Sequence, residues 1–284
     1  MFDLILENKN GDQLTFGQQS PFTVTEIQGL NPTPAFIYTN EVALLDGAMF
    51  NNSKLDVRQI NIAFAIETDP ARNRLEVYKV LKPKQYIKVI YIGDYRKVYA
   101  EGYISAVDIT FWEMKQTVTV SITCPDPYLH AVAQNSNALA ALQDMFSFPF
   151  YGTSTRNIAF GVYLSDTATF IENDGDVDCG MIFDLIATAA CGMPSIYNDD
   201  TGDHMTINYS MEAGDEIIID TRKGHKSVTL IRNAVETNII NYFAQGSTWL
   251  QLPANGASFS YSTSGGNNAQ LEISIQHDDL YEGV

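Results

Sequence analysis

The stretch VTVSITCPDPYL, Val118 to Leu129, decides how this sequence is divided. From Val118 to Ile122 apolar residues alternate with Thr and Ser, and this period of two predicts a strand with one buried face. Pro125 and Pro127 then remove two backbone donors, so a sheet cannot continue through them. We therefore expect one β-rich domain to end near residue 130 and a second one to follow.

The length of the chain supports this division. At 284 residues, one hydrophobic core commonly gives way to two. We expect a first domain at residues 1–130, a linker at 131–160 and a second domain at 161–284.

No apolar run approaches the roughly 20 residues that span a bilayer, and the start Met1-Phe2-Asp3 lacks the pattern of a signal peptide. Neither membrane insertion nor export is therefore expected.

The net charge of −17 is distributed unevenly. Residues 131–284 carry 5 Lys and Arg against 19 Asp and Glu, whereas residues 1–130 carry 12 against 15. Because phosphate binding needs clustered cations, nucleic acid is not an expected partner. The nearly neutral first half can pack closely against other copies. If the protein forms a ring, the first half is therefore the better candidate for its wall.

Residues 31–56 are expected to form a long arm with turns at its bends. The segment begins with two prolines, contains the turn pair Asp46-Gly47, and holds many apolar residues for a solvated loop. Such residues need a partner surface, either within the chain or on a neighbouring copy. The candidate contact residues in and beside this arm are Pro34, Phe36, Ile37, Leu44, Leu45, Asp46, Gly47, Met49, Phe50 and Arg58.

The clearest helix signal follows the arm. Asp69 can cap a helix whose first residue is Pro70, and the helix should end near Leu81, before a second proline. Two apolar stripes fit its spacing, and either could face the core. The first consists of Leu75, Tyr78 and Leu81, and the second of Val77 and Leu81.

The second half has the pattern of a β-sandwich. From residue 161 onward, short strand patterns alternate with Gly, Asn and Asp turns, without a long helix. Residues 138–145 are expected to form a short helix, and 146–160 an aromatic linker. The loop Thr221–Lys226 is a basic spot on an acidic domain. Arg222, Lys223 and Lys226 are therefore candidate contacts for an acidic partner, or they simply limit self-repulsion.

Catalytic and metal-binding patterns are weak. No two histidines have helical ligand spacing and no G-x-S-x-G elbow is present, so neither an enzyme nor a cofactor is expected. Cys124, Cys179 and Cys191 are expected to be free, buried thiols. The acidic turns Asp174–Asp178 and Asn198–Asp203 offer oxygen ligands for calcium, but Asp and Asn are also common in turns for local reasons.

Several short motifs follow one another in a particular order. They are IQGL (Ile27–Leu30), the pair Asp46-Gly47, Arg58 opening a strand, PARNRLEVYKVL (Pro70–Leu81), CPDPYL (Cys124–Leu129), ENDGDVD (Glu172–Asp178), AGDEIIIDTRKGHKSVTL (Ala213–Leu230) and YEGV (Tyr281–Val284). This order resembles the distal tail protein family of long, non-contractile phage tails. The similarity covers about residues 20–130 and 160–284.

The resemblance implies a mainly β fold of two domains. The N-terminal one would be a β-sandwich or split-barrel-like domain with one helix and a long hairpin arm, and the C-terminal one a galectin-like β-sandwich. It also implies a structural, non-enzymatic protein of the virion tail tip, made in the cytoplasm of the bacterial host. Six copies would form a ring, with each arm lapping onto the adjacent subunit. The implied partners are the major tail tube protein, the tail-associated fibre or lysin protein, and the tape-measure protein.

An alternative function is the binding of host-wall carbohydrate by the C-terminal sandwich. The galectin pattern His-x-Asn-x-Arg, with a Trp followed by Glu, is absent here. His204 is followed by Met-Thr-Ile-Asn, and Trp249 by Leu-Gln-Leu. These departures count against lectin activity. A further alternative is a monomeric two-domain β-protein that forms no ring.

Overall fold

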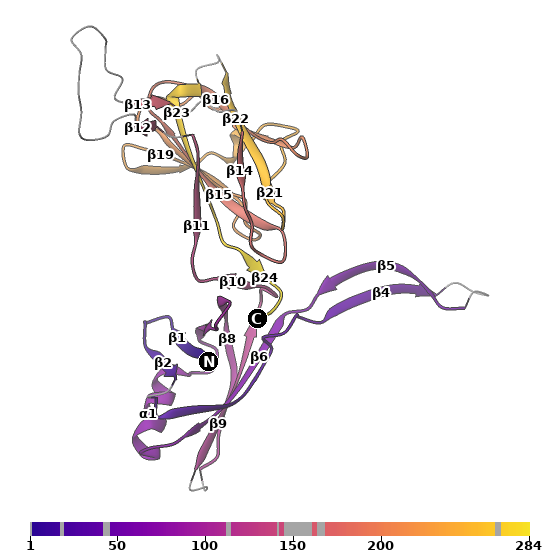
Figure 1. The fold of residues 1–284 in the computed structure, drawn as a ribbon, viewed down its shortest axis with the longest axis vertical. Coiled ribbons are helices and arrows are strands. Elements are labelled where there is room, and N and C mark those ends of the chain that lie inside the picture. Colours follow the sequence, from indigo (N-terminus) through magenta and orange to yellow (C-terminus); the bar gives the residue numbers. More distant parts are fainter. Residues whose placement is uncertain are drawn as a thin grey trace. The chain divides into compact units, whose positions relative to one another are not determined.

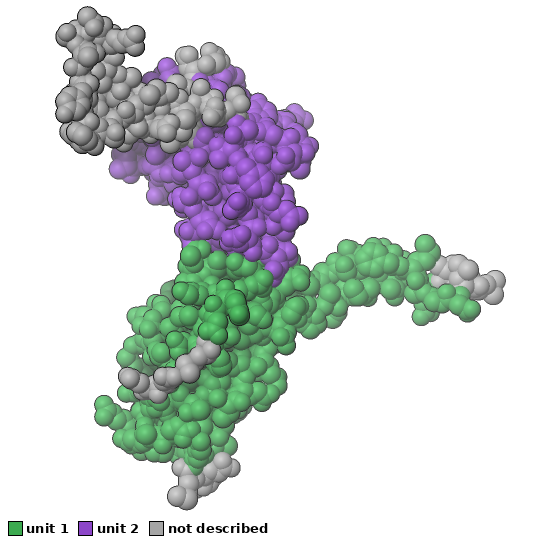
Figure 2. Space-filling model, viewed as in Figure 1, with its two compact units in different colours: residues 1–133, 280–284 green, residues 134–279 purple. Residues whose placement is uncertain are grey.

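The structure is a computed structural model that describes residues 2–17, 20–41, 46–111, 115–140, 142–144, 161–163, 168–264 and 268–284. These residues are mainly in β-strands, with one α-helix among them. The chain forms two compact units, shown in Figure 2: unit 1 comprises residues 1–133 and 280–284, and unit 2 comprises residues 134–279. The predicted fold class, mainly β with two domains, is confirmed.

The bounds of the units differ from the expected domain bounds at both ends of unit 2. The chain leaves unit 1 after residue 133, and residues 280–284 return to it. There β24 (Leu280–Tyr281) pairs with β10 (Leu129–Ala131), which also pairs with β8 (Lys97–Ile109). The last strand of the sequence is therefore part of the first sheet.

Unit 1 is built on one large antiparallel sheet. Its main path runs in the order β2 (Gln13–Phe16), β1 (Asp3–Asn8), β7 (Tyr86–Ile92), β8, β9 (Gln116–Cys124), β6 (Arg58–Ile66) and β3 (Phe22–Gln28). The alternation expected from Val118 onward is confirmed, because Val118, Val120 and Ile122 are fully buried on β9. The strand ends at Cys124, directly before Pro125.

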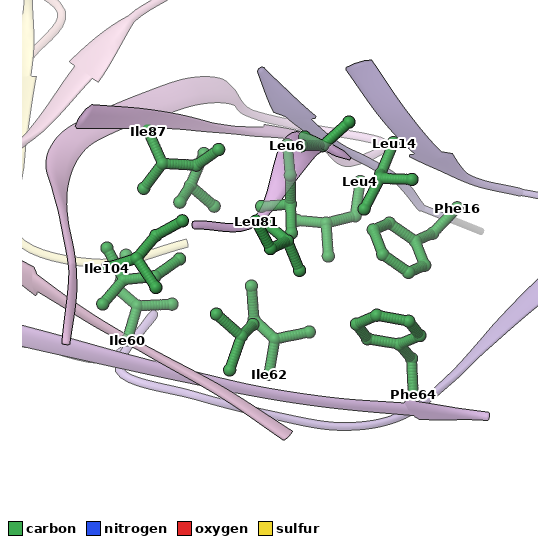
Figure 3. Close-up of a cluster of buried hydrophobic side chains, with 14 of the residues drawn as sticks. Leu4, Leu6, Leu14, Phe16, Ile60, Ile62, Phe64, Leu81, Ile87 and Ile104 are labelled. Atoms are coloured by element: carbon green, nitrogen blue, oxygen red, sulfur yellow. The ribbon is translucent and has the colours of Figure 1, made fainter. Parts of the chain in front are cut away.

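The two outermost strands of this path come together at the core. Phe16 on β2 lies 5.9 Å, centroid to centroid, from Phe22 on β3, and both rings contact Phe64 on β6, at 4.8 and 5.7 Å. Figure 3 shows Phe16 and Phe64 packed beside the aliphatic core residues of β1 and β6. The sheet therefore curls into a split barrel, because its opposite edges share one aromatic cluster.

The helix α1 (Pro70–Val80) begins where the sequence predicts it. Asp69 accepts a hydrogen bond from the backbone N–H of Arg72 at 3.4 Å, and Pro70 occupies the first turn. Leu81 ends the helix and donates its N–H to the carbonyl of Val77. Within the described residues, no helix is long and apolar enough to cross a bilayer.

Only the second of the two predicted stripes of α1 faces the core. Val77 and Leu81 are buried, together with Val80. Leu75 is 65% exposed and Tyr78 is 39% exposed, so the first stripe was the wrong one. A period of 3.6 residues allows both stripes, and the contacts with β1, β2 and β6 decide between them.

Unit 2 is a sandwich of two antiparallel sheets. The larger has the order β11 (Asn135–Ala140), β23 (Leu271–His277), β15 (Cys179–Ala187), β18 (Glu216–Asp220), β19 (Ser227–Arg232) and β20 (Val235–Asn238), with β21 (Gln251–Leu252) also on β15. The smaller has the order β14 (Thr169–Ile171), β22 (Ala257–Ser264), β16 (Gly192–Asn198) and β17 (His204–Thr206). Phe183 of β15 meets Phe259 of β22 edge to face at 6.4 Å, so the two sheets share one core.

The helix predicted for residues 138–145 is wrong in its described part. Residues up to Ala140 belong to β11, which pairs with β23. Leu142–Asp144 form β12, which pairs with β13 (Gly161–Tyr163). Pairing with distant strands therefore overrides the helical preference of an alanine-rich segment. The predicted aromatic linker, 146–160, lies outside the described residues.

The three cysteines are free and buried, as predicted. Burial raises the pKa of the Cys124 thiol to about 11 and that of the Cys179 thiol to about 12. Burial also raises the pKa of Cys191. All three thiols are therefore protonated at neutral pH and act as small core residues.

An ion pair between a buried carboxylate and a partly exposed arginine joins the start of β18 to the end of β19 and makes unit 2 sensitive to acid. Arg232 donates from Nε to Asp215 Oδ1 at 2.7 Å and from Nη2 to Oδ2 at 2.5 Å, and these hydrogen bonds lower the pKa of Asp215. Since the folded pKa is the lower one, the stabilisation is present above the ordinary value near 3.8. It is lost as the pH falls through the lowered pKa.

We expect Asp215→Asn to destabilise unit 2 at neutral pH by about 1.5–3 kcal/mol, the usual contribution of a hydrogen bond to a charged group. The difference from the unmodified chain should shrink as the pH is lowered below that ordinary value. Urea unfolding over a pH series checks both statements when it is followed by the fluorescence of Trp249 in a Trp112→Phe background, which removes the other tryptophan of the chain. A difference that stays constant down to the lowest pH would contradict the role of this ion pair.

Candidate functional site

The arm is a hairpin that stands apart from the sheet of unit 1. Its strands, β4 (Ala35–Glu41) and β5 (Ala48–Leu55), pair with each other from Ala35↔Leu55 to Glu41↔Ala48 and with no other strand of the described residues. Figure 1 shows the hairpin extending away from the rest of its unit. The arm therefore does not fold back onto its own sheet.

The large apolar side chains of the arm are exposed. Phe36 is 48%, Ile37 59%, Met49 62% and Phe50 66% exposed. An isolated two-stranded hairpin is marginally stable in water, and contiguous exposed apolar residues typically mark a surface that binds another molecule. The arm is therefore the strongest candidate for a functional site.

A β-bulge places apolar side chains on both faces of the arm. The register shifts between Tyr38 and Thr39, so Asn51 has no partner and Phe50 lies opposite Thr39. Because side chains alternate along a strand, Phe36 and Tyr38 share one face, while Ile37 shares the other with Phe50. Neither face of the arm is purely polar.

The base of the arm is held by a single buried arginine, Arg58, the first residue of β6. Its guanidinium donates to four backbone carbonyls, those of Pro127 (2.8 Å), Gly29 (2.6 Å), Asn31 (2.9 Å) and Glu282 (2.8 Å). The first belongs to the turn after β9, the next two to the entry of the arm, and the last to the C-terminal residues. Arg58 thereby joins three segments that are distant in the sequence.

The backbone around Arg58 is adapted to this arrangement. Gly29 has a φ of +93°, and a Cβ at this position would lie 1.9 Å from the carbonyl oxygen of Gln59. Only glycine therefore allows the entry of the arm to pass so close to β6. Thr33 adds a hydrogen bond to the same Pro127 carbonyl at 3.0 Å, and Val284 donates its N–H to the carbonyl of Leu30.

Arg58 is thus not a contact residue for a neighbour, and that expectation is corrected. Its side chain is 1% exposed and its donors are directed into its own unit. Burial lowers the pKa of Arg58 somewhat, but the guanidinium remains charged at neutral pH. The residue positions the arm, and the sequence carried no signal of this because its partners are backbone atoms elsewhere in the chain.

The other candidate contact residues of the arm have different positions. Pro34, Asp46 and Gly47 are exposed, in addition to the four apolar residues given above. Gly47 has a φ of +87°, as the predicted turn requires. Leu44 and Leu45 lie outside the described residues. Whether these residues contact a neighbouring copy stays a prediction.

The basic loop Thr221–Lys226 connects β18 to β19, and its cations are partly engaged within unit 2. Arg222 forms an ion pair with Asp220 at 2.7 Å. Lys226 Nζ lies 5.6 Å from the centroid of the Trp249 ring, and Lys223 is exposed. Internal partners reduce the positive field that the loop offers, and its role as a contact for an acidic partner stays a prediction.

The two acidic turns have local structural roles. Asn173 Oδ1 accepts from the N–H of Gly175, and Asn198 Oδ1 accepts from Asp200 and Thr201. Asp200 Oδ2 in turn accepts from the N–H of Ser258, at 2.8 Å. Over the ranges that the structure describes, no three His, Cys, Asp or Glu side chains form a group that could hold a metal ion.

The residues considered for carbohydrate binding are packed against other aromatic rings. Trp249 stacks on Phe243 at 4.5 Å, with 12° between the ring planes, and His204 stacks on Tyr197 at 6.1 Å. A sugar site needs a free aromatic face beside several polar groups. One face of Trp249 is already covered by Phe243, which leaves less of the ring for a ligand.

The comparisons with known proteins define the class. Residues 9–124 match the family model described as a phage tail protein RIFT-related domain, and residues 174–278 match that of the C-terminal domain of siphovirus-type tail components. This chain is therefore a component of a phage tail. It belongs to the distal tail (Dit) protein family of siphophages, a family of structural baseplate hub proteins and not of enzymes.

Solved structures with the same fold agree with this family. The chain is similar to the crystal structure of the SPP1 Dit protein (gp 19.1), described as a paradigm of the hub adsorption apparatus in phages that infect Gram-positive bacteria. The TM-score is 0.70 at 12% identity, with 98% of each chain covered. It is also similar to a chain of the activated phage P2 baseplate, with a TM-score of 0.51 at 11% identity, covering 97% of this chain and 98% of the other. No curated protein sequence matches the chain.

Proposed function

We propose that this protein forms a hexameric ring at the distal tip of a phage tail. In this proposal the ring connects the major tail tube protein to the tail-associated fibre or lysin protein, with the tape-measure protein near its lumen. The protein is made in the cytoplasm of the bacterial host and has no catalytic activity of its own. The single observation that carries the proposal is the exposed apolar arm of unit 1.

The arm supports a repeated, head-to-tail interface. A hairpin that projects from one subunit contacts a different surface of the next subunit, and such an interface closes into a ring when the rotation between subunits permits it. Because apolar residues lie on both faces of the arm, either face can contact a neighbouring subunit. The nearly neutral charge of the first half of the sequence removes most of the repulsion between copies.

The mass of the purified protein in solution tests the ring directly. Native mass spectrometry and mass photometry should give a species of six 31.5-kDa chains, and negative-stain images should show sixfold rings. A chain that stays monomeric over the whole accessible concentration range, and that forms no ring when mixed with its tail tube protein, would argue against the proposal.

A carbohydrate-binding function has no comparable support. Within the described part of unit 2, Trp249 and His204 both stack on neighbouring rings. Isothermal titration with host-wall polysaccharide tests this alternative. We expect no heat of binding above that of a matched sample containing serum albumin.

A further inference from the structure

The outer side of α1 carries an apolar patch that the fold of unit 1 does not use. We define the helix patch as Arg74, Leu75, Tyr78 and Phe111. Leu75 is 65%, Tyr78 39% and Phe111 50% exposed. Arg74, Leu75 and Tyr78 are neighbours on the helix surface, since residues three and four apart lie one above the other. The guanidinium of Arg74 lies 5.1 Å from the centroid of the Phe111 ring, which joins the end of β8 to the helix.

The helix patch is not part of the core. The opposite stripe of α1, with Val77 and Leu81, already fills the barrel and satisfies the need of the helix for one buried face. The two large apolar side chains on the solvent side of the helix, Leu75 and Tyr78, are therefore not needed to build the core. Within the described residues, the patch remains open to solvent even in the folded unit.

We propose that the helix patch is the surface on which the arm of a neighbouring copy docks. This inference rests on the proposed ring, and it identifies the partner of each arm as α1 of the next subunit. The arm and the helix patch both expose aromatic and aliphatic side chains, so their contact removes apolar surface of both from water.

The charges of the two elements are complementary. The arm, residues 31–56, carries three acidic residues, Glu41, Asp46 and Asp56, against one lysine. Residues 69–82, which form α1 and its ends, carry four basic residues against two acidic ones. Lys79 pairs with Asp12, whereas Arg72 has no ion pair among the described residues and lies exposed beside Leu75. A net negative arm therefore meets a net positive helix, which favours this pairing over contact between two arms.

The positions of the two elements suit a closed ring. In Figure 1, α1 and the arm lie on opposite sides of the sheet of unit 1. A head-to-tail interface uses two different surfaces of each subunit, and this arrangement keeps the arm and the helix patch apart on one chain. An arm on the same side as its receptor would instead favour contact with its own subunit.

Photo-crosslinking of the full chain tests this pairing. A benzophenone amino acid is placed at Tyr38 in one variant and at Phe50 in another, so that each face of the arm carries one probe. After irradiation, crosslinked dimers are digested and the peptides are identified by mass spectrometry. We expect at least one variant to form crosslinks to peptides from Pro70–Val80 of a second copy.

The outcomes separate this inference from the proposed ring. Crosslinks from both probes to other segments of a second copy leave the ring intact and overturn the docking on α1. The absence of any crosslink between copies counts against both. The double variant Leu75→Asp/Tyr78→Asp should lower the yield of the crosslink at least tenfold, whereas Val235→Asp, an exposed apolar position in unit 2, should leave it unchanged.

A mixing experiment provides a second test. A chain with an inactivated arm (Phe36→Asp/Phe50→Asp) and a chain with an inactivated helix patch (Leu75→Asp/Tyr78→Asp) should each be monomeric. Mixed in equal amounts, they should form a heterodimer in which the intact arm of one variant binds the intact patch of the other. Nothing larger should form, because the arm and the patch that remain free in this dimer are both inactivated. A helix-patch variant that still assembles like the unmodified chain overturns the inference. Circular dichroism and thermal melts verify that both variants are folded.

Discussion

Replacing Arg58 by methionine is expected to destabilise unit 1 by at least about 3 kcal/mol. Methionine fills much of the volume but donates no hydrogen bond. The carbonyls of Gly29, Asn31 and Glu282 lose the donor that Arg58 supplied, and that of Pro127 keeps only the hydrogen bond from Thr33. A buried polar group that loses its partner costs about 1–3 kcal/mol, and water can reach only part of this buried site. The same change should also loosen the entry of the arm, because the carbonyls of Gly29 and Asn31 lose their common donor.

The free energy of unfolding of unit 1 is best measured by hydrogen exchange. A protein with two units need not unfold in one step, whereas the amides of β6 and β9 report on unit 1 itself. Arg72→Met, on the exposed side of α1, serves as the matched control and should change this free energy by less than about 0.5 kcal/mol. Arg58→Lys should lower the free energy of unfolding of unit 1 by an amount between those of Arg72→Met and Arg58→Met, because one ammonium group cannot reproduce the hydrogen bonds of the planar guanidinium.

An effect of Arg58→Met below about 1 kcal/mol, the size of one ordinary hydrogen bond, would mean that water replaces the guanidinium and that the arm is held by other contacts. In that case, hydrogen exchange of the arm itself shows whether Arg58 positions the arm without stabilising the rest of unit 1. Faster exchange in β4 and β5 at unchanged stability of β9 would assign Arg58 to positioning of the arm alone.

Removal of the arm is expected to abolish self-association and leave unit 1 folded. Ala35 and Leu55 are paired across the base of the hairpin, so an Asn-Gly turn can replace residues 36–54 between them. The arm strands pair only with each other among the described residues, and therefore the free energy of unfolding of unit 1 should change by less than about 1 kcal/mol. The dissociation constant between copies should rise at least about 100-fold, or roughly 2.7 kcal/mol.

Sedimentation velocity over a concentration series measures this change. Ser53→Ala, at an exposed polar position of the arm, provides a milder variant that should retain assembly. A shortened chain that still forms hexamers would show that the ring wall is built by the barrel surfaces and not by the arm. The proposed role of the arm would then be wrong even though the family assignment stands.

Much of unit 1 could be predicted because its signals are local. The alternation in β9 specifies a strand with one buried face, and Pro125 ends it. The cap at Asp69 and the proline at the first turn set the start of α1. The excess of apolar residues in the arm was likewise visible without coordinates, and so was the prediction that they need a partner.

Contacts between distant residues decided the rest. The two possible stripes of α1 have the same periodicity, and only packing against the barrel distinguishes Val77 from Leu75. The carbonyl of Glu282, which receives a hydrogen bond from Arg58, lies 224 residues away in sequence, and no pattern of residue types marks a backbone acceptor. The sequence by itself determined the strand that ends before Pro125, the start of α1 and the apolar excess of the arm, since each is a property of neighbouring residues. Only the tertiary structure decided that the barrel closes through Phe16, Phe22 and Phe64 and that the last residues return to unit 1, because burial and pairing there join segments far apart in the chain.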